Sequence, residues 1–205
     1  MRRRTTIAGA VLVVAIAAAT LLISTLRYGF SAQDEPTAIE HVLAVAMRRY
    51  AVPADLRDRK NPVPLTPEVL AEARAHFADH CANCHANDGK GQTAIGQNLY
   101  PKAPDMTLPE TQSQTDGALF ATIENGIRLT GMPAWGNGTA ESAYGSWTLV
   151  HFIRHLPKLT PQDLEEMKEL NPKSRDEFEQ EEAARRFLAG EGEATRSGAA
   201  AGHKH

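Results

Sequence analysis

This sequence of 205 residues has few cysteines and little net charge. The two cysteines, Cys81 and Cys84, can form at most one disulfide, so no disulfide framework holds the fold. The 22 basic side chains nearly balance the 25 acidic ones, and a net charge of −3 gives no reason to expect a nucleic acid partner. The length fits one modest domain with additions, which excludes a large multidomain enzyme.

The charge that is present is distributed unevenly. Residues 1–61, 62–160 and 161–205 carry net charges of +4, −3 and −4. We interpret this pattern as an anchor with a stalk, a compact domain and an acidic tail. The predicted boundaries are a membrane anchor over 1–28, a stalk with an amphipathic helix over 29–65, a central domain over 66–158 and a tail over 159–205.

One long apolar run is present, at residues 7–26, without a single charged side chain. At ~1.5 Å per residue, a helix of this length spans ~30 Å, the thickness of the bilayer interior. Arginines at positions 2–4 precede the run, and this excess of positive charge keeps the N-terminus in the cytoplasm. We therefore predict a single-pass anchor in the cytoplasmic membrane, with the rest of the chain on the periplasmic, external side.

A cleaved signal peptide is the alternative interpretation of this run. Apolar regions of signal peptides are shorter, at ~7 to 15 residues, and end at a small-x-small site. Cleavage behind Ala32 would place bulky Phe30 where a small side chain is needed. Cleavage within the alanines at 17–19 stays open, and so does the question of whether the segment is removed.

The part of the chain after the apolar run is predicted to consist of helices joined by long loops. Apolar residues recur at helical spacing in the stalk between Asp34 and Pro53, and this stripe either packs on the following domain or lies at the membrane surface. Three further helices are predicted over 66–81, 115–125 and 139–156. In the tail, helix-capping residues predict further helix, and the composition of the last part predicts disorder. Its last residues include His203 and His205, which either bind a transition metal or are solvated.

The run Cys81-Ala82-Asn83-Cys84-His85 fits C-x-x-C-H, the pattern at which c-type haem is attached covalently. Residues three apart share one face of a helical turn, so both thiols can add to the two vinyl groups on one haem edge. His85 then lies under the iron as an axial ligand. A haem also explains how short helices and long loops form one domain, since its large apolar ring supplies the missing core.

Two other uses of this cysteine pair are less consistent with the sequence. A zinc site would combine the cysteines with His76, His80 or His85, but the second ligand pair expected of a structural site is absent. A redox-active C-x-x-C normally follows a strand, and here a helix precedes it.

The second axial ligand decides what a haem does, and Met132 is the predicted one. It lies in Gly131-Met132-Pro133, 47 residues after His85, in an irregular stretch between two helices. A thioether ligand raises the reduction potential and fills the open iron position, which favours electron transfer over oxygen chemistry. Its rivals, Met106 and Met167, are predicted to be packing or surface residues.

Taken together, these features resemble class I c-type cytochromes, and more closely the bacterial membrane-anchored monohaem ones. The resemblance spans about residues 66–157. It rests on Phe77, the C-x-x-C-H motif, Asp88-Gly89-Lys90-Gly91, the run 123–127 leading to Gly131-Met132-Pro133-Ala134-Trp135, and the closing helix over 147–156.

The resemblance implies an all-α cytochrome c fold of three main short helices and long loops around one covalent haem c. By position, Cys81 and Cys84 carry the thioether links, and His85 and Met132 are the axial ligands. Phe77 and Trp147 are expected to meet where the first and last helices cross.

One departure from the family pattern concerns the residues after the motif. In Gly96-Gln97-Asn98-Leu99, Gln97 replaces a proline that is common in a segment that often supplies the carbonyl acceptor for the histidine ring. The acceptor for His85 is therefore open, with Gln97, Pro101 and Pro104 as candidates.

The predicted function is one-electron transfer between membrane or periplasmic redox proteins whose identities the sequence does not give. No catalytic acid, base or nucleophile stands out, so we expect neither an enzyme nor a small-molecule substrate. A structural or electron-entry subunit of a larger respiratory complex is the alternative. A haem enzyme or gas sensor is a further one, and it requires that Met132 leave the iron.

Overall fold

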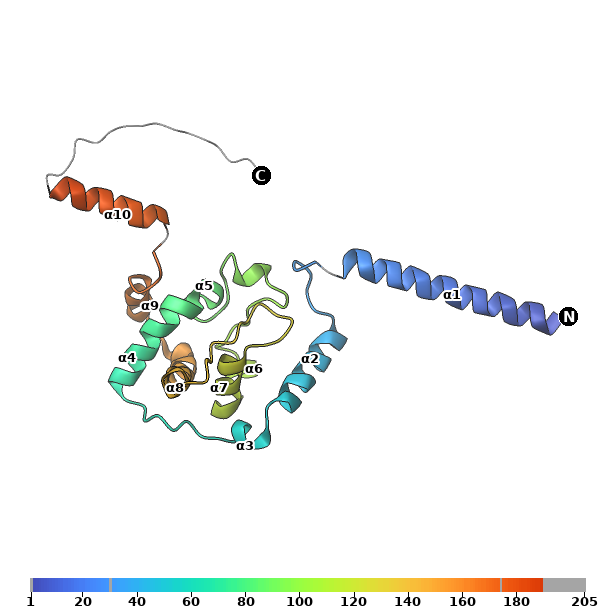
Figure 1. Ribbon diagram of the computed structural model, residues 1–205, viewed down its shortest axis with the longest axis horizontal. Coiled ribbons are helices and arrows are strands. Elements are labelled where there is room, and N and C mark those ends of the chain that lie inside the picture. The colour runs from blue at the N-terminus through green and yellow to red at the C-terminus, as the bar shows by residue number, and fades with distance from the viewer. Residues whose placement is uncertain (1, 30, 174, 190–205) are drawn as a thin grey trace. The chain divides into compact units, whose positions relative to one another are not determined.

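The computed structural model describes residues 2–29, 31–173 and 175–189, which form helices and loops with no strand (Figure 1). The chain divides into two compact units, Met1–Asn171 and Pro172–His205. The predicted all-α class is confirmed, whereas His203 and His205 lie outside the described residues. The α-helices are α1 (Arg2–Tyr28), α2 (Ala38–Ala51), α3 (Ala54–Arg57), α4 (Pro67–His76), α5 (Ala82–His85), α6 (Pro109–Gln112), α7 (Asp116–Asn125), α8 (Ala140–His155), α9 (Pro161–Lys168) and α10 (Arg175–Leu188), and the other helical turns are η1 (Phe77–Cys81), η2 (Gly96–Asn98) and η3 (Leu156–Lys158).

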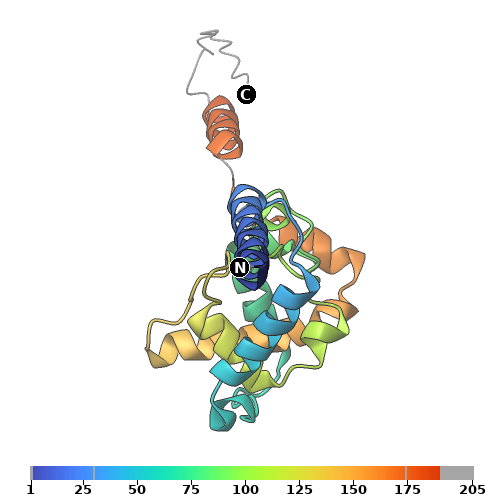
Figure 2. The ribbon, with the colours of Figure 1, turned by 90° about the vertical axis from the view of Figure 1, so that its right-hand side faces the viewer.

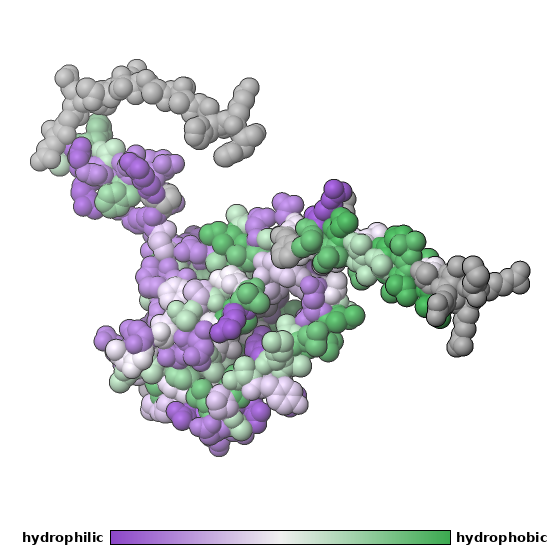
Figure 3. All heavy atoms as spheres, turned by 45° about the vertical axis from the view of Figure 1, so that its right-hand side comes forward, coloured by the Kyte–Doolittle hydropathy of each residue, from purple (hydrophilic) through white to green (hydrophobic). Residues whose placement is uncertain are grey.

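The predicted apolar span forms one helix, α1. Its segment Gly9–Arg27 is long and apolar enough to cross a membrane, and none of that segment is buried. The green, hydrophobic side chains of this helix are visible in Figure 3. By length and composition, α1 is suited to be a single-pass anchor.

Helices α4 and α8 pack against each other, and α7 packs against α8, around one apolar core. The ring of Phe77 contacts Phe152, with centroids 4.9 Å apart, and Trp147 stacks on Phe120 at 4.1 Å. The two aromatic rings expected to meet at the crossing therefore have different partners. Residues five apart on a helix point about 140° apart, so α8 turns Phe152 toward α4 and Trp147 toward α7.

The compact unit continues past the third main helix into α9. A capping box between Thr160 and Asp163 starts this helix, and Met167 near its end is completely buried. Arg74 of α4 forms ion pairs with Asp163 and Glu166, both at 3.0 Å. The first part of the acidic tail therefore packs on the haem-motif helix.

One arginine joins α8 to the start of α7. Arg154 pairs with Asp116 at 2.9 Å and donates to the carbonyl oxygens of Gln112 and Gln114. Arg154→Leu removes the charge partner and leaves the carbonyls without this donor, so we expect a loss of about 2–3 kcal/mol in the free energy of unfolding. Urea denaturation followed by circular dichroism measures the loss.

The matched control is Arg175→Leu, which removes an ion pair of α10 with an arginine side chain that is 89% exposed. Exposed pairs of this kind contribute less than about 1 kcal/mol. Equal denaturation midpoints for the two variants would contradict the role given to Arg154.

Candidate functional site

The C-x-x-C-H motif sits at the end of a helix that changes its winding. The hydroxyl of Thr66 caps α4 by accepting from the backbone N–H of Val69, and Pro67 occupies the first turn, as the sequence predicts. The helix then widens into the π-helical turn η1, which ends at Cys81, before α5 completes the motif. Such widened turns are frequently found at functional sites.

The two cysteines are free thiols, each partly buried. Burial, followed by the neighbouring Cys84, raises the pKa of Cys81 to about 12. The Cys81 side chain is therefore a protonated thiol at neutral pH. Within the described ranges no group of three or more His, Cys, Asp and Glu side chains is arranged to hold a metal ion.

His85 has the environment of an axial ligand. Burial lowers the pKa of its imidazole, which favours the neutral form that binds metals. Among the described residues, its Nδ1 is one of two buried side-chain atoms without a hydrogen-bond partner. Ala86, at a φ of +58°, ends α5 directly after it. If haem iron were bound at one ring nitrogen, the N–H at the other would need a hydrogen-bond acceptor to orient the ring.

In the described part of the chain, His85 Nδ1 forms no hydrogen bond with any of the three candidate acceptors. The Gln97 amide donates to the carbonyl oxygen of Gly91 at 2.9 Å, while Pro101 and Pro104 are exposed. The acceptor therefore stays unassigned.

The loop after the motif folds back onto it. The Thr93 hydroxyl donates to the carbonyl oxygen of Cys84 at 3.2 Å and accepts from the N–H of Gly96 at 2.8 Å. Further along, the N–H of Met106 donates to the carbonyl oxygen of Gly89 at 2.8 Å. A loop without helical or strand periodicity is thus held against the motif by hydrogen bonds, and it contains the short helices η2 and α6.

Met132 lies in a loop that turns back onto α7. Gly126, at a φ of +62°, ends α7, and the N–H of Ile127 donates to the carbonyl oxygen of Met132 at 3.1 Å. The N–H of Trp135 donates to the carbonyl oxygen of Ile123, also at 3.1 Å, which closes the loop. These two hydrogen bonds fix the loop that contains Met132 to the end of α7.

Two contacts connect this loop to the haem-motif side of the domain. The α-carbon of Gly131 lies so close to the side chain of Leu99 that a β-carbon would collide with it. The indole of Trp135 packs edge-on against His80, with centroids 5.5 Å apart, beside Cys81 in the sequence. Sequence analysis missed the pairing of Trp135 with His80, since nothing in a spacing of 55 residues signals it.

Met132 is partly exposed in this loop, whereas Met106 and Met167 belong to the buried core. The two rivals for the iron are therefore packing residues. Their side chains fill space between helices and are not free to reach a ligand at the surface of the loop.

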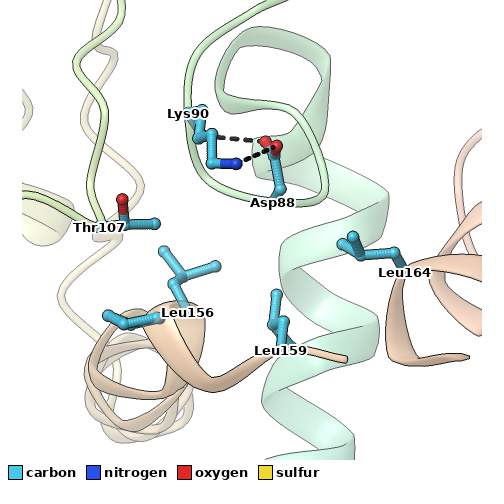
Figure 4. Close-up of a pocket in the computed structure, with 7 residues that line it drawn as sticks. Asp88, Lys90, Thr107, Leu156, Leu159 and Leu164 are labelled. Atoms are coloured by element: carbon cyan, nitrogen blue, oxygen red, sulfur yellow. Dashed lines mark hydrogen bonds and ion pairs between the residues drawn. The ribbon is translucent and has the colours of Figure 1, made fainter. Parts of the chain in front are cut away.

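One pocket of the described structure lies away from these residues. It has a volume of about 280 Å³ and lies between the turn after the motif and the end of α8 (Figure 4). Its lining includes Asp88, Lys90 and Leu156, but none of Cys81, Cys84, His85 and Met132. This pocket is thus separate from the predicted haem residues.

Comparison with known families decides what kind of domain this is. Residues 68–153 match the family model of cytochrome c oxidase, cbb3-type, subunit III. These residues form a c-type cytochrome domain. The match runs from α4 through most of α8, and so contains the C-x-x-C-H motif and the Met132 loop.

The match confirms the resemblance to c-type cytochromes drawn from the sequence. A cytochrome c domain carries covalently bound haem c and works in electron transfer, so the cofactor type follows from the family. The chain fits haem in three respects: two free thiols in the motif, a partly buried imidazole with a lowered pKa, and a methionine loop that contacts the loop after the motif. The anchor and stalk lie outside the matched residues.

Proposed function

We propose that this protein is an anchored one-electron carrier with one haem c, attached through Cys81 and Cys84 and ligated by His85 and Met132. The observation that carries the proposal is the C-x-x-C-H turn within a cytochrome c domain whose methionine loop contacts the loop following that turn. When bound, the haem iron cycles between Fe(III) and Fe(II). The chain's residues tether it, supply both axial ligands and exclude other ligands from the iron.

The protein environment sets how the iron is used. Partial burial lowers the pKa of His85, which favours the neutral imidazole, the form with a lone pair for a metal. A thioether at Met132 favours Fe(II) over Fe(III), because a soft neutral ligand donates less charge to the iron. Both effects suit a carrier that takes up and releases an electron without chemistry on a substrate.

The proposed layout keeps the carrier at a membrane. Residues 1–28 form the anchor, 29–65 the stalk, 66–158 the haem domain and 159–205 the tail, whose helix α9 packs on α4. The arginines at positions 2–4 favour a cytoplasmic N-terminus, and therefore a haem domain on the periplasmic side. Its partners are redox proteins of that side or of the membrane.

Redox titration of the full chain, expressed with haem-attachment machinery and followed by absorption, tests this proposal. We expect a single one-electron transition, a low-spin spectrum and the weak near-infrared band of sulfur-to-iron charge transfer. A high-spin spectrum with rapid binding of carbon monoxide would favour a haem enzyme or gas sensor instead.

A second candidate function is electron entry into a larger respiratory complex. The matched family is named after an oxidase subunit, and this observation favours it. Extraction in mild detergent followed by native electrophoresis distinguishes the two. Migration of the haem with a large complex supports the subunit, and migration as a small species supports the free carrier.

The turn at Gly126 offers a test of how the Met132 loop is held. A β-carbon there would lie 2.5 to 2.7 Å from the backbone of Met132, Pro133 and Ala134, at a φ of +62°. We expect Gly126→Ala to displace the loop, weaken the near-infrared band and cost at least about 1–2 kcal/mol in stability. Absorption spectra and urea denaturation measure the two effects.

Gly138→Ala is the matched control. Gly138 also has a positive φ, of +81°, but no atom lies within 4 Å of its added β-carbon. This variant should lose only the stability that an alanine at a positive φ costs, and it should keep the near-infrared band. If both variants keep the band, the close approach at Gly126 does not position Met132.

A further inference from the structure

Helix α2, between the anchor and the cytochrome domain, has an apolar face with no partner in the described structure. Apolar side chains recur on one side of it, and none of its residues is buried. Their exposed fractions lie between 56% and 90%, for Ile39, Val42, Leu43, Met47 and Tyr50. Continuous exposed apolar faces of this kind mark interaction surfaces.

The helix is well formed, so the exposed face does not result from fraying. The side chain of Thr37 accepts from the N–H of Glu40, and the Glu40 carboxylate accepts from the N–H of Thr37, which completes a capping box. The Tyr50 hydroxyl is the one polar group among the side chains of the stripe. On the opposite side of the helix lie His41 and Arg48, since helix positions advance by about 100° per residue.

Both flanks of α2 are attached to the cytochrome domain without using the stripe. Before the helix, Glu35 forms an ion pair with Lys102. After it, α3 packs on α7 in the ribbon of Figure 2. There the Thr115 hydroxyl donates to the carbonyl oxygen of Arg57. Gly117 of α7 allows the Leu56 carbonyl to approach closely. Because both flanks are held, whatever covers the stripe also orients the domain.

The short linker between α1 and α2 limits how far the stripe can lie from the membrane. Nine residues, 29–37, join the end of α1 to the start of α2. Fully extended, they reach about 30 Å. With α1 in a bilayer, this linker lets α2 reach the lipid surface and keeps its start within about 30 Å of that surface. Arg49, at the edge of the stripe, can place its stem along the apolar surface and its charge among lipid phosphates.

We propose that α2 lies in the membrane interface, with the stripe of Ile39, Val42, Leu43, Met47 and Tyr50 in lipid. The helix thereby acts as a second attachment point beside α1. Since α3 joins α2 directly to α7, this attachment fixes the orientation of the cytochrome domain relative to the membrane. The occupant of the face is the lipid surface.

Site-directed spin labelling of the full chain tests this proposal. Cys81 and Cys84 are expected to be thioethers in the haem-loaded protein, so an introduced cysteine is the only reactive thiol. Single variants Ile39→Cys and Leu43→Cys probe the stripe, His41→Cys probes the opposite side, and Leu65→Cys probes an exposed apolar position outside α2. Each is labelled with a nitroxide and placed, one copy per nanodisc, in phosphatidylethanolamine and phosphatidylglycerol, with the haem reduced.

Power saturation with oxygen and with a water-soluble nickel complex gives the environment of each label. At positions 39 and 43 we expect several-fold greater accessibility to oxygen than to nickel, and the reverse order at 41 and 65. In the Leu43→Glu/Met47→Glu background, the label at 39 should become accessible to nickel.

Two results would overturn the proposal. Nickel accessibility at 39 and 43 equal to that at 41 and 65 would place the stripe in water. Protection from both reagents would mean that protein covers it, and one copy per nanodisc restricts that protein to this chain. Uptake of label by the unsubstituted chain would show free thiols at Cys81 and Cys84, and would contradict the proposed haem attachment instead. The proposal for α2 and the proposed function are therefore contradicted by different results.

Discussion

Replacing Met132 with leucine is expected to lower the reduction potential and open the iron to external ligands. Axial ligands and their surroundings shift haem potentials over a range of about 0.8 V, so we expect a decrease of at least roughly 0.1 V. Leucine keeps the volume of the side chain but has no sulfur to donate to the iron. Redox titration measures the decrease, and the near-infrared band should vanish while carbon monoxide binds rapidly to the reduced form.

The controls for this variant are the same change at the two buried methionines. Met106→Leu and Met167→Leu alter packing by less than about 1.5 kcal/mol and should leave the spectrum and potential unchanged. An unchanged potential in Met132→Leu would remove Met132 from the iron. A decrease in Met106→Leu instead would assign the ligand to the core methionine.

Replacing both cysteines with serine is expected to abolish covalent attachment of haem completely. A hydroxyl does not form the thioether link, so no haem should remain with the chain on a denaturing gel stained for haem peroxidase activity. The domain should also unfold at a much lower temperature, because few large side chains are available for its core. Far-ultraviolet circular dichroism during heating measures this change.

Asn83→Ser is the matched control, since it introduces the same residue at an exposed position inside the same turn. It should keep full haem staining and nearly normal stability. Single variants, Cys81→Ser or Cys84→Ser, should retain haem through the remaining link. Full haem staining in the double variant would show that the motif is not the attachment site.

The sequence predicted the local features of this protein well, because their causes are local. The caps at Thr66, Thr115, Thr139 and Thr160 each depend on a hydroxyl and a backbone N–H a few residues away, and all four start helices. The apolar span is likewise a property of consecutive residues. The C-x-x-C-H spacing falls within one helical turn, so its chemistry could be inferred without any tertiary information.

The interior pairings could not be predicted in the same way. Phe77 was expected to meet Trp147, yet its ring contacts Phe152. The difference depends on how α8 is rotated about its axis, which is set by all the side chains in its interfaces together. The contact of Trp135 with His80 likewise joins segments far apart in the chain.

By itself, the sequence determined the cofactor class, the all-α fold and the apolar span, because each follows from residues close together in the chain. Only the tertiary structure decided that Met106 and Met167 are core residues, that α9 packs on α4 and that the α2 stripe has no partner within the described residues. These outcomes depend on which distant surfaces bury each other. Such a choice minimises the free energy of the whole domain, and no single segment encodes it.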